Sequence, residues 1–340
     1  MSVTLEDVAK RANLNIGSVS RILNGKGTGY SDQTRQRVFD TANELGYRPN
    51  MLARALQTGR TNTIALCVPF TGNYSPYLGY LYHCLQAPST QYHYQLITEI
   101  IPEPTAEPLK KPQLMNWPVD GIICSYIADS SVNYLQSLVK RGCPIVHVQQ
   151  SHMASLEHYT NIDYVLIDLY SGAQQAIKHL LESGCHRIAF VGQQYIYEED
   201  IRARAYRELM SAAGKQPEHV VTEGGTRICG YEGLKAYIQS HGCPDGIFCP
   251  NDEFAIGCYL AMQEMGIQVP NDTLLVGFDG LENARLFSCP ISSVVIPVEK
   301  MCALAWEMLV ERIENPSLPS RQIQLETSLE VRASSKRDNP

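Results

Sequence analysis

From residue 63 onward, short apolar segments alternate with amphipathic ones, and this alternation limits the fold more than any other feature. The apolar segments are Thr63–Val68, Tyr94–Thr98, Gly121–Cys124, Pro144–Val148, Tyr164–Ile167, Arg187–Val191, Val220–Thr222, Gly246–Cys249, Leu274–Phe278 and Gln322–Val331. Helical patterns between them include Ser171–Glu182, Ala203–Ala213, Tyr231–Ser240 and Glu253–Met265. Buried strands joined by crossover helices form parallel sheets covered on both faces. About nine or ten strands suit two such sheets better than one.

Residues 4–24, TLEDVAKRANLNIGSVSRILN, predict two short helices, Leu5–Ala12 and Ile16–Leu23, joined by a tight turn. Thr4 and Asn15 are residues of the kind that cap helix N-termini. The apolar residues of each helix fall on one side. The outer face of the second helix is then formed by Ile16, Gly17, Ser20 and Arg21. A helix-turn-helix presents such a face to the DNA major groove.

A third helix is expected after Ser31, its cap, and it continues to about Leu45, where Gly46 ends it. The stretch Asn50–Gln57 then predicts a helix of only eight residues, which is marginal alone in water.

The net charge of −7 is unevenly distributed. Residues 1–60 hold nine Lys and Arg against five Asp and Glu, or +4, and the remainder of the chain carries −11. A basic head on an acidic body fits polyanion binding that is confined to the head.

The chain has no apolar run near the roughly 20 residues of a membrane helix, and its first residues lack the features of a secretory signal. We therefore expect a cytoplasmic protein. The eleven cysteines include no C-x-x-C pair and no cluster with zinc spacing, so buried free thiols are expected. No cofactor or metal is predicted.

Five stretches carry a resemblance to a known family. They are VTLEDVAKRANLNIGSVSRILNG, ELGYRPNMLARALQTGRTNTIAL, IKHLLESGCHRIAFVG, PNDEFAIGCYLAMQEMGIQVPND and LLVGFDG. Through them the chain resembles the LacI/GalR (lactose/galactose repressor) family of bacterial transcriptional regulators over essentially its full length.

The resemblance implies an α + α/β fold, with a helix-turn-helix three-helix head and a hinge helix. Two Rossmann-like parallel α/β subdomains of periplasmic-binding-protein type would follow. The expected domains are a DNA-binding domain at 1–49, a hinge helix and linker at 50–60, and an effector-binding and dimerisation domain at 61–340. Within the last, the N-subdomain would take about 61–165 and 295–323, and the C-subdomain about 166–294 and 324–333.

Carried onto this sequence, the base-reading positions are Ile16, Gly17 and Arg21. Arg21 can donate two hydrogen bonds to a guanine edge, whereas Ile16 offers only apolar contact, for instance to a thymine methyl group. Phosphate contacts are expected from Ser20, Asn24, Ser31, Thr34 and Arg54, although Ser31 is equally well explained as a helix cap. Leu56 of the hinge helix would wedge between base pairs from the minor groove. The paired sites imply a homodimer on a near-palindromic double-stranded DNA operator.

Ligands of open parallel sheets bind beyond the carboxyl ends of the strands. The candidate effector residues are Tyr77, Tyr126, Arg202, Asn251 and Asp279. Arginine, asparagine and aspartate beside aromatic rings suit a polyhydroxylated ligand. The expected effector is a sugar or related small metabolite, and a structural role remains the alternative for each of these residues.

Two other classes of function fit parts of the sequence. A periplasmic-type solute-binding protein would explain the body but not the head. An enzyme is disfavoured because no nucleophile elbow, phosphate loop, dinucleotide fingerprint or metal cluster is present, and the acid run Glu198–Asp200 is interpreted as a solvated loop. A regulator that has lost its effector response stays open.

Overall fold

The computed structural model describes residues 3–25, 28–48, 59–69, 75–101, 118–125, 138–148 and 162–337. Arg54, Leu56 and Tyr126, together with the expected hinge helix at Asn50–Gln57, lie outside the described residues. The chain divides into two compact units, Met1–Asn62 and Thr63–Pro340.

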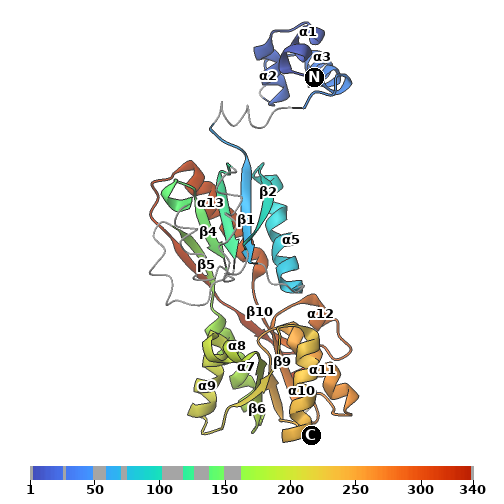
Figure 1. Ribbon diagram of the computed structural model, residues 1–340, viewed down its shortest axis with the longest axis vertical. Coiled ribbons are helices and arrows are strands. Elements are labelled where there is room, and N and C mark those ends of the chain that lie inside the picture. The colour runs from blue at the N-terminus through green and yellow to red at the C-terminus, as the bar shows by residue number, and fades with distance from the viewer. Residues whose placement is uncertain are drawn as a thin grey trace, which may run out of the picture. The chain divides into compact units, whose positions relative to one another are not determined.

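Three helices form the first unit: α1 (Leu5–Ala12), α2 (Ile16–Leu23) and α3 (Asp32–Glu44) (Figure 1). The predicted bounds of α1 and α2 are confirmed, and α3 ends one residue before the expected position. The three predicted caps are also confirmed, because Thr4, Asn15 and Ser31 each accept a hydrogen bond from a backbone N–H three residues ahead. The helices enclose a small core of Val8, Ala9, Ala12, Val19, Ile22, Val38 and Ala42.

The second unit contains two sheets. Within the described residues, sheet A has six strands in the order β11-β5-β4-β3-β1-β2. They are β1 (Thr63–Pro69), β2 (Gln95–Ile101), β3 (Gly121–Ser125), β4 (Ile145–Val148), β5 (Asp163–Ile167) and β11 (Gln322–Leu325). Every neighbouring pair is parallel, so the carboxyl ends of all six strands lie at one edge.

Sheet B also has six described strands, in the order β12-β10-β9-β8-β6-β7. They are β6 (Ile188–Gly192), β7 (Glu218–Val221), β8 (Gly246–Phe248), β9 (Leu274–Asp279), β10 (Ser292–Val295) and β12 (Ser328–Glu330). Only the pairing of β10 with β12 is antiparallel. The sequence pattern over Gln322–Val331 predicted one strand, and this was wrong: it forms β11 in one sheet and β12 in the other.

In the described part of the chain, the backbone passes between the sheets after β5, after β10 and after β11 (Figure 1). Two of these crossings are bonded to each other. The N–H of Asp168 donates to the carbonyl of Leu325 (2.9 Å), and Thr327 Oγ1 donates to the carbonyl of Asp168 (3.0 Å). Gln175 Nε2 donates in turn to the carbonyl of Thr327 (3.0 Å).

Described helices cover both faces of sheet B and one face of sheet A. Their bounds are α5 (Pro76–Gln91), α7 (Leu169–Glu182), α8 (Gln194–Glu199), α9 (Ile201–Ala212), α10 (Arg227–His241), α11 (Asp252–Glu264), α12 (Glu282–Arg285), α13 (Val298–Glu314) and the 3-10 turn Ala333–Ser335. Helices α5 and α13 pack on sheet A, α7 and α9 on one face of sheet B, and α10 and α11 on the other. No described helix is long and apolar enough to cross a membrane.

Helices α10 and α11 pack with their backbones nearly touching. A Cβ added at Gly257 of α11 would lie 2.0 Å from the carbonyl oxygen of Arg227, and one at Gly230 of α10 would lie 2.9 Å from that of Phe254. The close approach of the two helix backbones therefore requires glycine at both positions. All eleven cysteines are free thiols, as expected, and six of them are buried.

Candidate nucleic-acid interface and effector site

The outer face of α2 carries the three predicted base-reading residues. Val19 and Ile22 turn inward and are fully buried, while Ile16 is 47% exposed and Gly17 and Arg21 are exposed beside it. Ser18 is also buried, and the Tyr30 hydroxyl donates to Ser18 Oγ at 2.7 Å. This bond fixes the rotation of α2 about its axis, so the outward direction of Ile16 follows from the packing of the unit.

The four predicted phosphate-contacting residues in the described head hydrogen-bond among themselves. Asn24 Nδ2 donates to the carbonyl of Ser20 (2.8 Å) and to Ser20 Oγ (3.3 Å). Ser31 Oγ lies 2.9 Å from Thr34 Oγ1 and accepts from the Thr34 N–H. These bonds pre-order both pairs, and Ser31 is a helix cap whether or not it also contacts DNA.

Asp279 stands at the carboxyl end of β9, where the sequence placed it. Its φ is 112°, a left-handed value that costs a non-glycine residue free energy. Burial raises the pKa of its carboxyl well above the ordinary value, and the neighbouring Asp252 carboxyl raises it further. Arg202 opposes this rise, and the N–H of Asp252 donates to the carboxyl. The geometry thus brings Asp279, Asp252 and Arg202 together.

Asp252 is a buried carboxyl that the sequence did not select as an effector residue. Oδ2 accepts from the N–H of Leu281 and Oδ1 accepts from Ser293 Oγ, both at 2.6 Å. Gly277 leaves space for it, since a Cβ there would lie 2.3 Å from Asp252 Oδ1. Burial raises the pKa of Asp252 to about 7. Asp252 therefore ties the start of α11 to the turn after Asp279 and to β10.

Arg202 is already engaged within the protein. Its guanidinium donates to both carboxylate oxygens of Asp200 (2.9 and 2.7 Å) and to the carbonyl of Pro250, and it lies 5.3 Å from the centre of the Phe278 ring. The interpretation of Glu198–Asp200 as a solvated loop was wrong. Glu198 and Glu199 belong to α8, and Asp200 caps α9 by accepting from the Arg202 N–H at 2.8 Å.

The remaining candidates have structural roles. Asn251 caps α11, since its Oδ1 accepts from the N–H of Phe254 at 2.7 Å. Tyr77 lies on α5 and is a member of the main core cluster. Across the residues that the structure describes, no three His, Cys, Asp or Glu side chains gather as metal ligands would.

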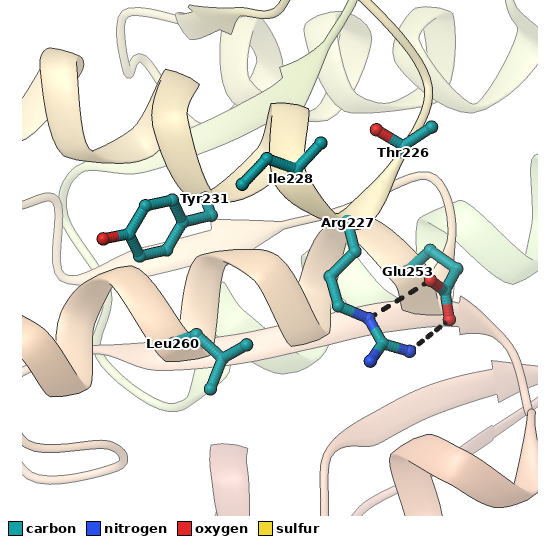
Figure 2. Close-up of a pocket in the computed structure, with 6 residues that line it drawn as sticks. All are labelled: Thr226, Arg227, Ile228, Tyr231, Glu253 and Leu260. Atoms are coloured by element: carbon teal, nitrogen blue, oxygen red, sulfur yellow. Dashed lines mark hydrogen bonds and ion pairs between the residues drawn. The ribbon is translucent and has the colours of Figure 1, made fainter.

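A cavity of ≈ 490 Å³ lies against α10 and α11, apart from the effector candidates. It is lined by Thr226, Arg227, Ile228, Tyr231, Glu253 and Leu260, and its lining is mostly apolar (Figure 2). Arg227 and Glu253 form a two-point ion pair at its edge (3.2 and 2.8 Å). Neither Asp279 nor Arg202 lines this cavity.

Sequence reasoning noted Asp252 as a residue that follows a strand but did not include it among the effector candidates, and it missed Asp200 and Ser293. An Asn-Asp pair directly after a buried strand was the available signal for Asp252. Ser293 gave no signal, because its bond to Asp252 joins residues 41 positions apart.

The two units of the chain match two different protein families. Residues 4–50 match the family described as bacterial regulatory proteins, lacI family, and residues 177–335 match the periplasmic binding protein-like domain. The chain is 32% identical to the HTH-type transcriptional regulator DegA of Bacillus subtilis over 308 residues, 89% of each protein. It is 29% identical to catabolite control protein A of Priestia megaterium over 343 residues, 99% of this chain and 100% of that protein.

Solved structures show the same architecture. The lac repressor dimer bound to operator and the anti-inducer ONPF superposes with a TM-score of 0.83 at 20% identity, covering 98% of this chain and 99% of that one. The transcriptional regulator CelR–cellobiose complex superposes with a TM-score of 0.68 at 27% identity, with the same coverage. These likenesses confirm the expected head and two parallel α/β sheets.

Proposed function

The chain belongs to the lacI family of bacterial regulatory proteins, and from this premise we propose that it binds a near-palindromic operator as a homodimer and represses transcription under the control of a small-molecule effector. The family makes it a DNA-binding transcription regulator and not an enzyme. Because its operator would lie in the cytoplasm, we place the protein there.

The outer face of α2 is the observation that carries the proposal. A helix-turn-helix with complete caps and a closed core presents Ile16, Gly17 and Arg21 outward. Arg21 supplies the guanidinium that can bind a guanine edge at two points, at about 1–3 kcal/mol of discrimination for each good contact. Ser20, Asn24, Ser31 and Thr34 hold the phosphates. Residues 1–49 would form the DNA-binding domain, and Arg54 and Leu56 of the linker at 50–60 would engage the minor groove.

The effector site is proposed within residues 61–340, at the carboxyl ends of β8 and β9. Support comes from Asp279, whose strained backbone is held in place by its neighbours, and from the cellobiose complex of a relative. Arg202, Asn251, Tyr77 and Tyr126 complete the proposed set, with a sugar or related polyhydroxylated metabolite as ligand. Because Arg202 is bound by Asp200, it would serve chiefly to neutralise and orient the site rather than to capture an anion.

A solute-binding protein without DNA regulation is excluded by the lacI-type head. A regulator without effector response is the remaining second candidate, and the charge balance around Arg202 is the observation that favours it, since this arginine is already paired.

One experiment separates the two. Purified full-length protein is used to select DNA from a random pool, and the affinity for the selected operator is then measured with and without a panel of pentoses, hexoses and disaccharides. We expect a near-palindromic site and a change in affinity of tenfold or more, on the order of a typical allosteric coupling, with at least one sugar. No preferred sequence would sink the proposed function, and no response across the panel would favour the effector-insensitive candidate. Analytical ultracentrifugation should show a dimer at micromolar concentration.

A further inference from the structure

The first turn of α2 carries no charged residue, and its N-cap is the neutral Asn15. Ile16 opens the helix with 47% of its surface exposed, and no acidic residue lies in the first turn. In contrast, α1 begins with Glu6 and Asp7. Acidic residues stabilise a helix N-terminus but repel phosphates. Without an acidic residue in its first turn, α2 lacks one source of helix stability. Its N-terminal end is apolar and uncharged, so it does not repel DNA.

Gly17 is not required by the fold. Its backbone is helical, and a Cβ added there would meet only Asn15 Oδ1, at an ordinary contact distance of 3.4 Å. Glycine weakens a helix interior relative to alanine. Neither the backbone conformation nor the packing therefore requires glycine at position 17. The space that glycine leaves open on the surface of α2 calls for another explanation.

These two residues adjoin the one side chain of this face suited to base edges. Gly17 and Arg21 are four residues apart, so they lie one above the other on the same face. No ion pair holds Arg21 among the described residues of the head. Ser20 and Asn24, the other polar residues nearby, are bonded to each other. The bare backbone at Gly17 thus lies one helical turn before Arg21 on the same face, and Ile16 adjoins Gly17 at the start of the helix.

We propose that Ile16 and the space at Gly17 form a receptor for the C5 methyl group of a pyrimidine in the major groove. Among the groups displayed there, only this methyl is apolar. The head would then distinguish thymine from uracil and 5-methylcytosine from cytosine at one position of each half-site. This inference rests on the proposed function, because it requires a specific operator.

The test replaces thymine by uracil, one symmetric pair of positions at a time, in the selected operator. Equilibrium affinity is measured for the full-length wild type and for Ile16→Ala, whose substitution lies on the surface. At one pair of positions, uracil should weaken wild-type binding about fourfold per half-site, or about fifteenfold in all, the effect of leaving one methyl group unburied. The same change should leave the affinity of Ile16→Ala nearly unaltered. If the selected base is cytosine, 5-methylcytosine should raise wild-type affinity by the same factor.

Two further variants sharpen the result. Phe39→Ala is the matched control, because Phe39 is 42% exposed on α3 of the same unit, and it should keep the full response to uracil. Gly17→Ala fills the open space and should weaken binding to the thymine operator more than to the uracil operator. Equal effects of uracil on wild type and Ile16→Ala at every position would overturn the inference, as would loss of the response in Phe39→Ala. Failure to select any preferred sequence would instead reject the proposed function.

Discussion

Among the described ion pairs of the second unit, the buried pair between Asp163 and Arg312 should be the most costly to break. Asp163 begins β5 and its side chain is fully buried, and that of Arg312 on α13 is only 6% exposed. Arg312 Nε and Nη2 donate to the two carboxylate oxygens, each at 2.7 Å. The same guanidinium donates to the carbonyls of Leu318 and Pro319, both at 2.8 Å. One side chain thus joins β5, which lies next to the edge of sheet A, to a helix and to the loop that leads to β11.

The perturbation is Arg312→Met, which keeps the aliphatic stem and removes the charge. Asp163 then stays buried with weaker partners, the N–H of Arg321 at 2.8 Å and its guanidinium at 3.6 Å. Removing one partner of a buried pair costs about 3–5 kcal/mol. Because Arg321 still contacts Asp163, we expect the free energy of unfolding to fall by about 3 kcal/mol, the lower end of that range. The carbonyls of Leu318 and Pro319, which lose their donor, would add to this loss.

Urea unfolding followed by tryptophan fluorescence measures this loss, at one fixed protein concentration. Trp306 is a suitable reporter because it is buried on α13, the helix that carries Arg312, and its Nε1 donates to the carbonyl of Leu85 at 2.9 Å. Arg187→Met is the matched control. Arg187 forms a two-point pair with Glu218, but its side chain is 44% exposed, so the loss should be about 0–1 kcal/mol. Equal losses in the two variants would refute the reasoning that burial decides the cost.

Three further outcomes are expected. Arg21→Ala should lower operator affinity by about 1–3 kcal/mol per half-site while salt-sensitive binding to random DNA persists; unchanged discrimination in a competition assay would mean that α2 is wrongly placed in the groove. The raised pKa of Asp252 means that the folded protein holds a proton that the unfolded chain releases between about pH 4 and pH 7, so thermal stability should fall as pH rises through this window and level off above it. Asp252→Asn should remove much of that slope in a series of thermal melts, and an unaltered slope would exclude Asp252 as its origin. Gly257→Ala should destabilise the second unit by about 3 kcal/mol or more in urea, because its Cβ would collide with the Arg227 carbonyl; a loss below about 1 kcal/mol would show that α10 and α11 can separate freely.

The sequence predicted best what depends on neighbouring residues. The caps of α1, α2 and α3 are bonds between residues three apart, so residue type and spacing suffice to find them. Strands such as β3, β5 and β6 were found because burial on both faces makes them apolar throughout. Strand β10 was not predicted, because it begins with two serines. Helix α13 was not identified, although its buried residues recur every three or four positions and lie on one face of the helix. Helix α5 contains Pro88, a residue that usually ends a helix.

The candidate site was predicted only in part, for a related reason. Asp279 was selected because it follows the apolar segment Leu274–Phe278, and in the structure it is the last residue of β9. The partners that fix its surroundings come from elsewhere: Ser293 lies in β10, and Asp252 bonds the N–H of Leu281 29 residues away. Such pairings are set by the order of strands in the sheet. The ion pair of Arg202 was missed although its partner, Asp200, is only two residues away. Asp200 belongs to the acid run Glu198–Asp200, which had been interpreted as a solvated loop.

The bonds between the two crossings near Asp168 and Thr327 have a mechanical consequence. If sheets A and B with their helices were joined by a single chain segment, they could bend, twist and slide relative to each other. Here adjacent segments share hydrogen bonds, and Gln175 on α7 holds them from the side of sheet B, donating to Thr327 and accepting from the N–H of Leu329. Sliding or twisting would break these bonds, whereas bending both segments together preserves them. These bonds therefore favour a bending motion that opens and closes the space between the two sheets, and a ligand would act by favouring one end of that motion.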